Sequence, residues 1–63
     1  MSLLKRATAK SLMYGDVILR NGERLQVEHI EQEIHGAMIE FIREFGGRFS
    51  VFMPYDEQVT IEL

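Results

Sequence analysis

An Asn-Gly pair between two short apolar segments is the feature that most constrains the fold of this chain. Asn21 and Gly22 separate residues 16–20 from residues 23–27, and both of these segments contain aliphatic side chains suited to strands. A two-residue turn of type I′ needs positive φ at both central residues, which Asn and Gly adopt most readily. The sequence therefore predicts a β-hairpin over residues 16–27.

Side-chain alternation assigns a face to each residue of this hairpin. We expect Val17 and Leu19 to face the core together with Leu25 and Val27, whereas Ile18 points to the opposite face. These assignments give the hairpin one apolar face and leave Ile18 on the outside.

The apolar positions change phase after the hairpin. They continue at Ile30 and Ile34, which are even-numbered, whereas Leu25 and Val27 are odd-numbered. A shift of one residue is what a β-bulge or a sharp bend produces. The sequence thus predicts a long, bent strand.

Residues 37–45 fit either a strand or a helix. As a strand they alternate and lead through Gly46-Gly47 into residues 48–53, which also alternate. As a helix they carry apolar residues at positions 38, 41, 42 and 45, the spacing of one helical face, and the stripe extends backwards to residue 30. The strand is the preferred interpretation, and a helix over residues 28–45 is the alternative.

The two ends of the chain complete the prediction. Residues 1–14 indicate a short helix or a tail that Gly15 ends, and residues 54–57 suit one turn of 3₁₀ helix before a last strand over 58–63. We therefore predict a mostly-β fold in which residues 15–63 form a single small five-stranded barrel. The alternative is an α+β domain with the helix over residues 28–45.

Composition excludes several classes of protein. The 63 residues allow one domain with a thin core, and the absence of cysteine excludes disulfides and thiolate metal sites. No apolar run approaches the roughly 18 residues of a membrane-spanning helix, and no secretory signal is evident, so we expect a cytoplasmic protein. His29 and His35 lie among Glu28, Glu31 and Glu33, which we interpret as a solvated acidic turn without metal or cofactor.

The sequence offers no pattern typical of an enzyme. It contains no nucleophile elbow and no phosphate-binding glycine loop. Paired carboxylates are plentiful, but at this density they usually serve to keep a protein soluble, so we predict a non-enzymatic protein. If the inward residues fill the barrel, four apolar side chains are left pointing outward: Ile18, Met38, Ile42 and Phe52. An apolar patch on a small acidic domain is typical of a protein interface. The alternative is that the N-terminal segment covers these side chains through Leu4, Leu12 and Met13.

The distribution of charge raises a second hypothesis. The first ten residues contain three basic side chains and no acid, whereas the other 53 contain four basic and ten acidic side chains. Arg43 and Arg48 also flank Phe45 and Phe49, and aromatic residues between arginines are typical of single-strand-binding surfaces. The candidate nucleic-acid residues are Lys5, Arg6, Lys10, Arg43 and Arg48. The acidic body argues against this use, and core packing is the alternative role of the phenylalanines.

Residues 19–26 resemble part of a known family. The segment Leu-Arg-Asn-Gly-Glu-Arg-Leu-Gln is similar to the first half of the Sm motif, and the bacterial Sm-like RNA chaperones carry a similar Asn-Gly-x-x-Leu-Gln. This resemblance, with five short strands and a 3₁₀ turn, implies the small barrel of SH3-like and Sm-like domains. Val27 stands where the motif has a second glycine, and residues 31–36 lack its Asp and Asn, so the resemblance does not imply the uridine-binding pocket.

These observations lead to one functional hypothesis and one alternative. We expect a non-enzymatic binding or assembly module that acts by self-association or by docking to a partner protein. The alternative is an Sm-like module that binds RNA or single-stranded nucleic acid.

Overall fold

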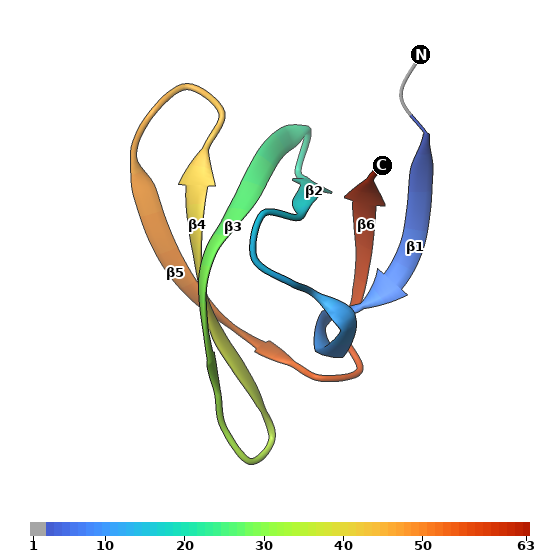
Figure 1. Ribbon diagram of the computed structural model, residues 1–63, viewed down its shortest axis with the longest axis vertical. Coiled ribbons are helices and arrows are strands. Elements are labelled where there is room, and N and C mark those ends of the chain that lie inside the picture. Colours follow the sequence, from blue (N-terminus) through green and yellow to red (C-terminus); the bar gives the residue numbers. More distant parts are fainter. Residues whose placement is uncertain (1–2) are drawn as a thin grey trace.

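One antiparallel sheet of six strands makes up most of the molecule. The computed structural model describes residues 3–63 (Figure 1). The elements are β1 (Leu4–Thr8), the 3₁₀ turn η1 (Ala9–Ser11), β2 (Val17–Arg20), β3 (Glu23–Gln32), β4 (Gly36–Arg43), β5 (Arg48–Pro54) and β6 (Gln58–Glu62). The strands lie in the order β1-β6-β2-β3-β4-β5. A mostly-β fold is thus confirmed.

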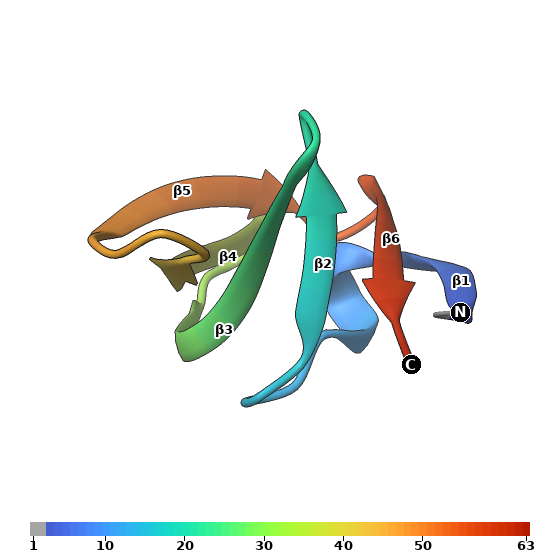
Figure 2. The same cartoon turned by 90° about the horizontal axis from the view of Figure 1, so that it is seen from above.

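The sheet curls strongly without closing. Figure 2 shows β5 bending over the concave side while β1 lies at the far edge. Among residues 3–63 no strand pairing joins β1 to β5, so the sheet remains open. The structure therefore has six strands in an open sheet instead of the predicted closed barrel of five.

The β2–β3 hairpin forms at the predicted place. Asn21 and Gly22 have φ of 53° and 77°, and the strands pair directly beside this two-residue turn. This register sets Ile18 opposite Leu25, and both side chains are buried in the core. The predicted outward orientation of Ile18 is wrong, because a side chain opposite Leu25 must share the face of Leu25. Val17 and Leu19 lie half-buried on the other face.

The predicted change of phase is a β-bulge in β3. The pairing of β3 with β4 shifts between Val27 and His29, so that Val27 opposes Phe41 and Ile30 opposes Ile39. The bulge lets the odd-numbered and even-numbered apolar residues of β3 face the same side.

Residues 37–45 are extended, and a helix over residues 28–45 is wrong. Most of the segment belongs to β4, which pairs with β3 on one side and with β5 on the other. Ala37, Ile39 and Phe41 are buried, as the strand interpretation predicted. Pairing on both sides satisfies most of the backbone of β4, which outweighs the helical spacing of its apolar residues.

The N-terminal segment is a strand and not the predicted helix or tail. β1 pairs along its whole length with β6, from Leu4 opposite Glu62 to Thr8 opposite Gln58. η1 follows at once, and its backbone donates from Ala9 to the Glu57 carbonyl at 2.9 Å. Residues 1 and 2 of the predicted helix or tail lie outside the described residues.

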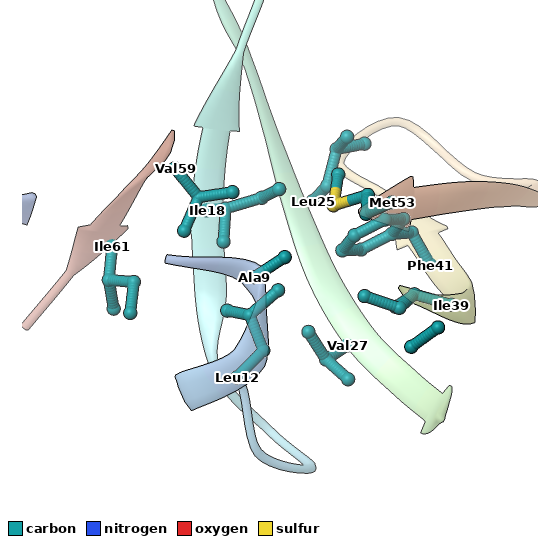
Figure 3. Packing of buried hydrophobic residues seen from close by; sticks show 11 residues of the cluster. Ala9, Leu12, Ile18, Leu25, Val27, Ile39, Phe41, Met53, Val59 and Ile61 are labelled. Atoms are coloured by element: carbon teal, nitrogen blue, oxygen red, sulfur yellow. The ribbon is translucent and has the colours of Figure 1, made fainter. Parts of the chain in front are cut away.

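The core lies on the concave face of the sheet and is closed at one end by η1. Figure 3 shows Ala9 and Leu12, from η1 and the residue after it, packed against the strands. The buried side chains are Ala9, Leu12, Ile18, Leu25, Val27, Ala37, Ile39, Phe41, Met53, Val59 and Ile61. For β2 we predicted that Val17 and Leu19 would face the core, but Ile18 is the residue of β2 that is buried there.

The turn between β5 and β6 ties two parts of the molecule together. The Glu57 N–H donates to the Pro54 carbonyl at 3.0 Å, which is the i→i+3 bond of the single turn predicted for residues 54–57 and is not continued into a helix. The hydroxyl of Tyr55 donates to the carbonyl of Glu33 in the β3–β4 connection.

No helix within residues 3–63 has the length and apolar character needed to cross a membrane.

Candidate functional site

Three of the four predicted interface residues do lie on the convex face of the sheet. Met38 on β4 stands directly opposite Phe52 on β5, and their exposed fractions are 38% and 40%. Ile42, four residues along β4, is half-buried opposite Arg48. Met38, Ile42 and Phe52 form what we call the convex patch. Ile18 is only 1% exposed and contributes nothing to it.

Polar side chains lie around and within the convex patch. Glu31 stands beside Met38 in the register, and Glu40, which stands between His29 and Ser50, separates Met38 from Ile42 along β4. Apolar side chains mixed with polar ones are the composition of ordinary protein interfaces. The patch is small, so on its own it presents an anchor and not a complete interface.

The backbone next to this patch is also available for pairing. β5 has seven residues, and among residues 3–63 only β4 pairs with it. Its one charged residue is Arg48 at the first position, and Pro54 ends it. An edge strand with unpaired N–H and C=O groups is a ready template for another strand.

The opposite edge of the sheet is less suited to pairing. β1 has five residues, and two of them are the cations Lys5 and Arg6. Short length and charged side chains are the usual means by which proteins protect an edge strand. The two edges therefore differ, and β5 is the more open of them.

The N-terminal segment does not cover the convex patch. Leu12 is buried in the core on the concave side, and Leu4 and Met13 are exposed. The alternative in which these three residues cover the outward-facing side chains is therefore wrong. Their positions follow from the pairing of β1 with β6 and from η1, which packs against β4 and β5 on the core side of the sheet and not on the convex side.

The five candidate nucleic-acid residues do not come together on one surface. Lys5 and Arg6 lie on β1 at one edge of the sheet, whereas Arg43 and Arg48 flank the β4–β5 loop near the other edge. Lys10 lies in η1, and its backbone N–H donates to the Tyr55 carbonyl beyond the far end of β5.

Acidic side chains also form ion pairs with the two arginines beside the β4–β5 loop. Arg43 Nε donates to Glu23 Oε2 at 3.0 Å and Nη2 donates to Oε1 at 3.2 Å. The hydrogen bonds and charge of Glu23 raise the pKa of Arg43 above its ordinary value. Arg48 Nη2 lies 3.7 Å from Glu28 Oε1. Both cations therefore have local counter-ions, which reduces their value for binding phosphates.

The two phenylalanines next to these arginines have separate roles. Phe49 packs against Phe41 with ring centroids 5.7 Å apart, which agrees with the core interpretation of this residue. Phe45 is 91% exposed at the tip of the β4–β5 loop. The structure thus leaves one free aromatic ring beside the arginines, and a stacking surface for successive bases needs several.

A groove that no sequence pattern predicted lies between the segment after η1 and the end of β3. It has a volume of about 630 Å³ and is lined by Leu12, Met13, Tyr14, Ile30, Glu31 and Gln32. Met13 and Tyr14 are exposed, and the Tyr14 ring lies 6.2 Å from the ring of His29. Only the fold brings residues 12–14 beside β3, so no local pattern could have indicated the groove.

The predicted acidic turn does not assemble a metal site within the described chain. Residues 3–63 contain no cluster of three or more His, Cys, Asp or Glu side chains able to hold a metal ion. Glu28 is the residue of the bulge, and it faces Arg48 instead.

No family model matches this chain, and no curated protein matches it either. The resemblance to Sm-like domains therefore remains a prediction from residues 19–26.

Proposed function

We propose that this protein is a non-enzymatic assembly module in which two copies associate through β5. The observation that carries the proposal is the unprotected edge of β5, which lies beside Met38, Ile42 and Phe52 of the convex patch. Backbone hydrogen bonds along β5 would supply the pairing, and the apolar side chains next to it would add buried area.

A second copy is the occupant that best fits this edge. Two β5 strands related by a two-fold axis run antiparallel, and the two-fold dimer is the commonest form of self-association. Each copy would also remove the other's exposed edge from water. A chain of 63 residues without cysteine has few other means of adding to a thin core.

Sedimentation velocity on the whole chain tests this proposal. We expect the mass to rise from 7.3 kDa toward twice that value between about 1 and 100 µM protein, because association follows mass action. Phe52→Lys places a charge beside the pairing edge and should keep the chain monomeric. Leu4→Lys is the matched control, since it introduces the same charge at an exposed apolar residue of β1.

A 7.3 kDa species over the whole concentration range would contradict self-association. Equal effects of Phe52→Lys and Leu4→Lys would contradict the choice of β5. If the chain stays monomeric but a heterologous protein protects the amides of β5 from hydrogen exchange, the edge serves docking to a partner instead.

The nucleic-acid alternative receives less support from the arrangement of charges. Lys5 and Arg6 are separated from Arg43 and Arg48 by the width of the sheet, and the latter two face Glu23 and Glu28. Salt-sensitive retention of an oligonucleotide at about 50 mM salt would favour it over assembly.

A further inference from the structure

A second candidate site lies at the end of the sheet where the β2–β3 turn approaches β5. It is a shallow pocket of about 320 Å³ on the core side, open to solvent. Leu25, Phe49 and Val51 give it apolar walls, and Arg20 and Glu23 are its charged residues. It is separate from the convex patch, because its apolar walls belong to the opposite face of the sheet.

The position of Arg20 follows from the strand alternation. Arg20 is two residues after Ile18 and therefore points to the same side of β2, toward the core. Its Nη1 atom is buried and has no hydrogen-bond partner among residues 3–63. A buried guanidinium nitrogen ordinarily has an acceptor, since its N–H groups lose water on burial.

The acid nearest to Arg20 in the strand register already accepts hydrogen bonds from another arginine. Glu23 stands opposite Arg20 across the turn, yet both of its carboxylate oxygens accept hydrogen bonds from Arg43. The Arg43 guanidinium also lies 5.9 Å from the centre of the Phe49 ring, which fixes it over the aromatic wall. Arg43 therefore takes the carboxylate that stands opposite Arg20, and the buried Arg20 Nη1 atom is left without an acceptor.

We propose that this pocket binds a carboxylate that carries a short apolar group, with Arg20 as the residue that holds the carboxylate. A guanidinium fork matches the two oxygens of a carboxylate, and the apolar walls suit a small aliphatic substituent. The charge of Glu23 beside the site disfavours a doubly charged phosphate. Such a carboxylate is found both in free short-chain acids and at the C-terminus of a peptide. The pocket lies within one chain, so the proposal does not depend on self-association.

Amide and arginine side-chain NMR spectra of the ¹⁵N-labelled chain test the site, with isobutyrate as the first probe. We expect saturable shifts of the Arg20 Nε–H signal and of the Phe49 and Val51 amides, with a Kd on the order of 1 mM. Isobutyramide, which has the same shape without the charge, should give no saturable shift. Arg20→Gln should weaken binding at least about tenfold, whereas Arg6→Gln on exposed β1 makes the same charge change and should leave it unaltered.

A pair of acetylated dipeptides that end in alanine distinguishes the two sources of the carboxylate. Tighter binding of the free-acid dipeptide than of isobutyrate, with no binding of its C-terminal amide, would identify a peptide terminus as the ligand. Tighter binding of isobutyrate would identify a free acid.

Three results would overturn the proposal. They are equal shifts with isobutyramide, equal affinity for inorganic phosphate, and unchanged affinity in an Arg20→Gln variant whose spectrum remains dispersed. If Arg20→Gln does not fold, the wild-type protein alone tests the proposal. Isobutyrate must then shift the Arg20 Nε–H signal, and an unchanged signal would overturn the proposal.

Discussion

Substitution of two neighbouring residues of β2 tests the register on which the whole fold depends. Ile18 is 1% exposed and faces Leu25, whereas Leu19 is half-buried on the convex face. Ile18→Ala and Leu19→Ala each remove three side-chain carbons, so the two variants differ in burial and not in chemistry.

The structure sets the expected magnitudes. Three fully buried carbons contribute about 2.5 kcal/mol of transfer free energy at roughly 0.8 kcal/mol each. The cavity left among the packed side chains brings the cost of Ile18→Ala to about 3–4 kcal/mol. Leu19→Ala should cost about 1 kcal/mol or less, because water already reaches its side chain.

Urea denaturation followed by circular dichroism measures these differences. A chain of this length has a free energy of unfolding of about 3–9 kcal/mol, so Ile18→Ala can unfold much of the protein. Ile18→Val provides a graded variant with an expected loss of about 1 kcal/mol. All variants must be compared at one protein concentration, since association would add to apparent stability.

The opposite order of effects would refute the register. If Leu19→Ala lowered the free energy of unfolding more than Ile18→Ala, then Val17 and Leu19 would be the core residues of β2. If the two-residue turn at Asn21-Gly22 were kept, Leu25 would then face the convex side together with Ile18. If Leu25 stayed in the core, the turn could not have two residues.

Three further substitutions examine other parts of the structure. Gly36→Ala should cost about 1–3 kcal/mol, because its Cβ would lie 2.4 Å from the Met53 carbonyl oxygen; a thermal midpoint equal to wild type would contradict this close approach. Tyr55→Phe should cost about 1 kcal/mol through loss of the bond to the Glu33 carbonyl, measured in urea; a neutral result would show that the bond contributes nothing. Arg43→Gln should lower the urea midpoint slightly at low salt and not at about 1 M salt, where exposed ion pairs are screened; a loss that persists at high salt would assign Arg43 a packing role.

The sequence predicted which residues form the strands of the central sheet better than it predicted which face of the sheet each side chain points to. The hairpin, the change of phase after Val27 and the two strands around Gly46-Gly47 all depend on local patterns, and each is present. The error at Ile18 was avoidable in principle. A two-residue turn at Asn21-Gly22 pairs residues whose numbers add to 43, which sets Ile18 and not Leu19 in line with Leu25.

The strand β1 could not have been predicted from its own residues. Leu4–Thr8 has no strong alternation, and only two of its side chains are even half-buried. It is extended because β6 offers it an unpaired edge, and strand formation at such a place depends on the neighbour more than on propensity. The missing acceptor of Arg20 could not be predicted for a similar reason, because it depends on which arginine Glu23 contacts in the folded chain.

The pairing of β1 with β6 also determines where association is expected. Without β1, the sheet would expose two edges of similar character, β6 and β5, and two copies could join in a head-to-tail series with no natural end. β1 covers β6 and replaces that edge with a short strand that carries Lys5 and Arg6. One unprotected edge then remains among the described residues, at β5, and a single such edge permits only a closed pair. Association of the whole chain should therefore stop at two copies, and larger assemblies would mean that the β1 edge pairs as well or that β1 leaves β6.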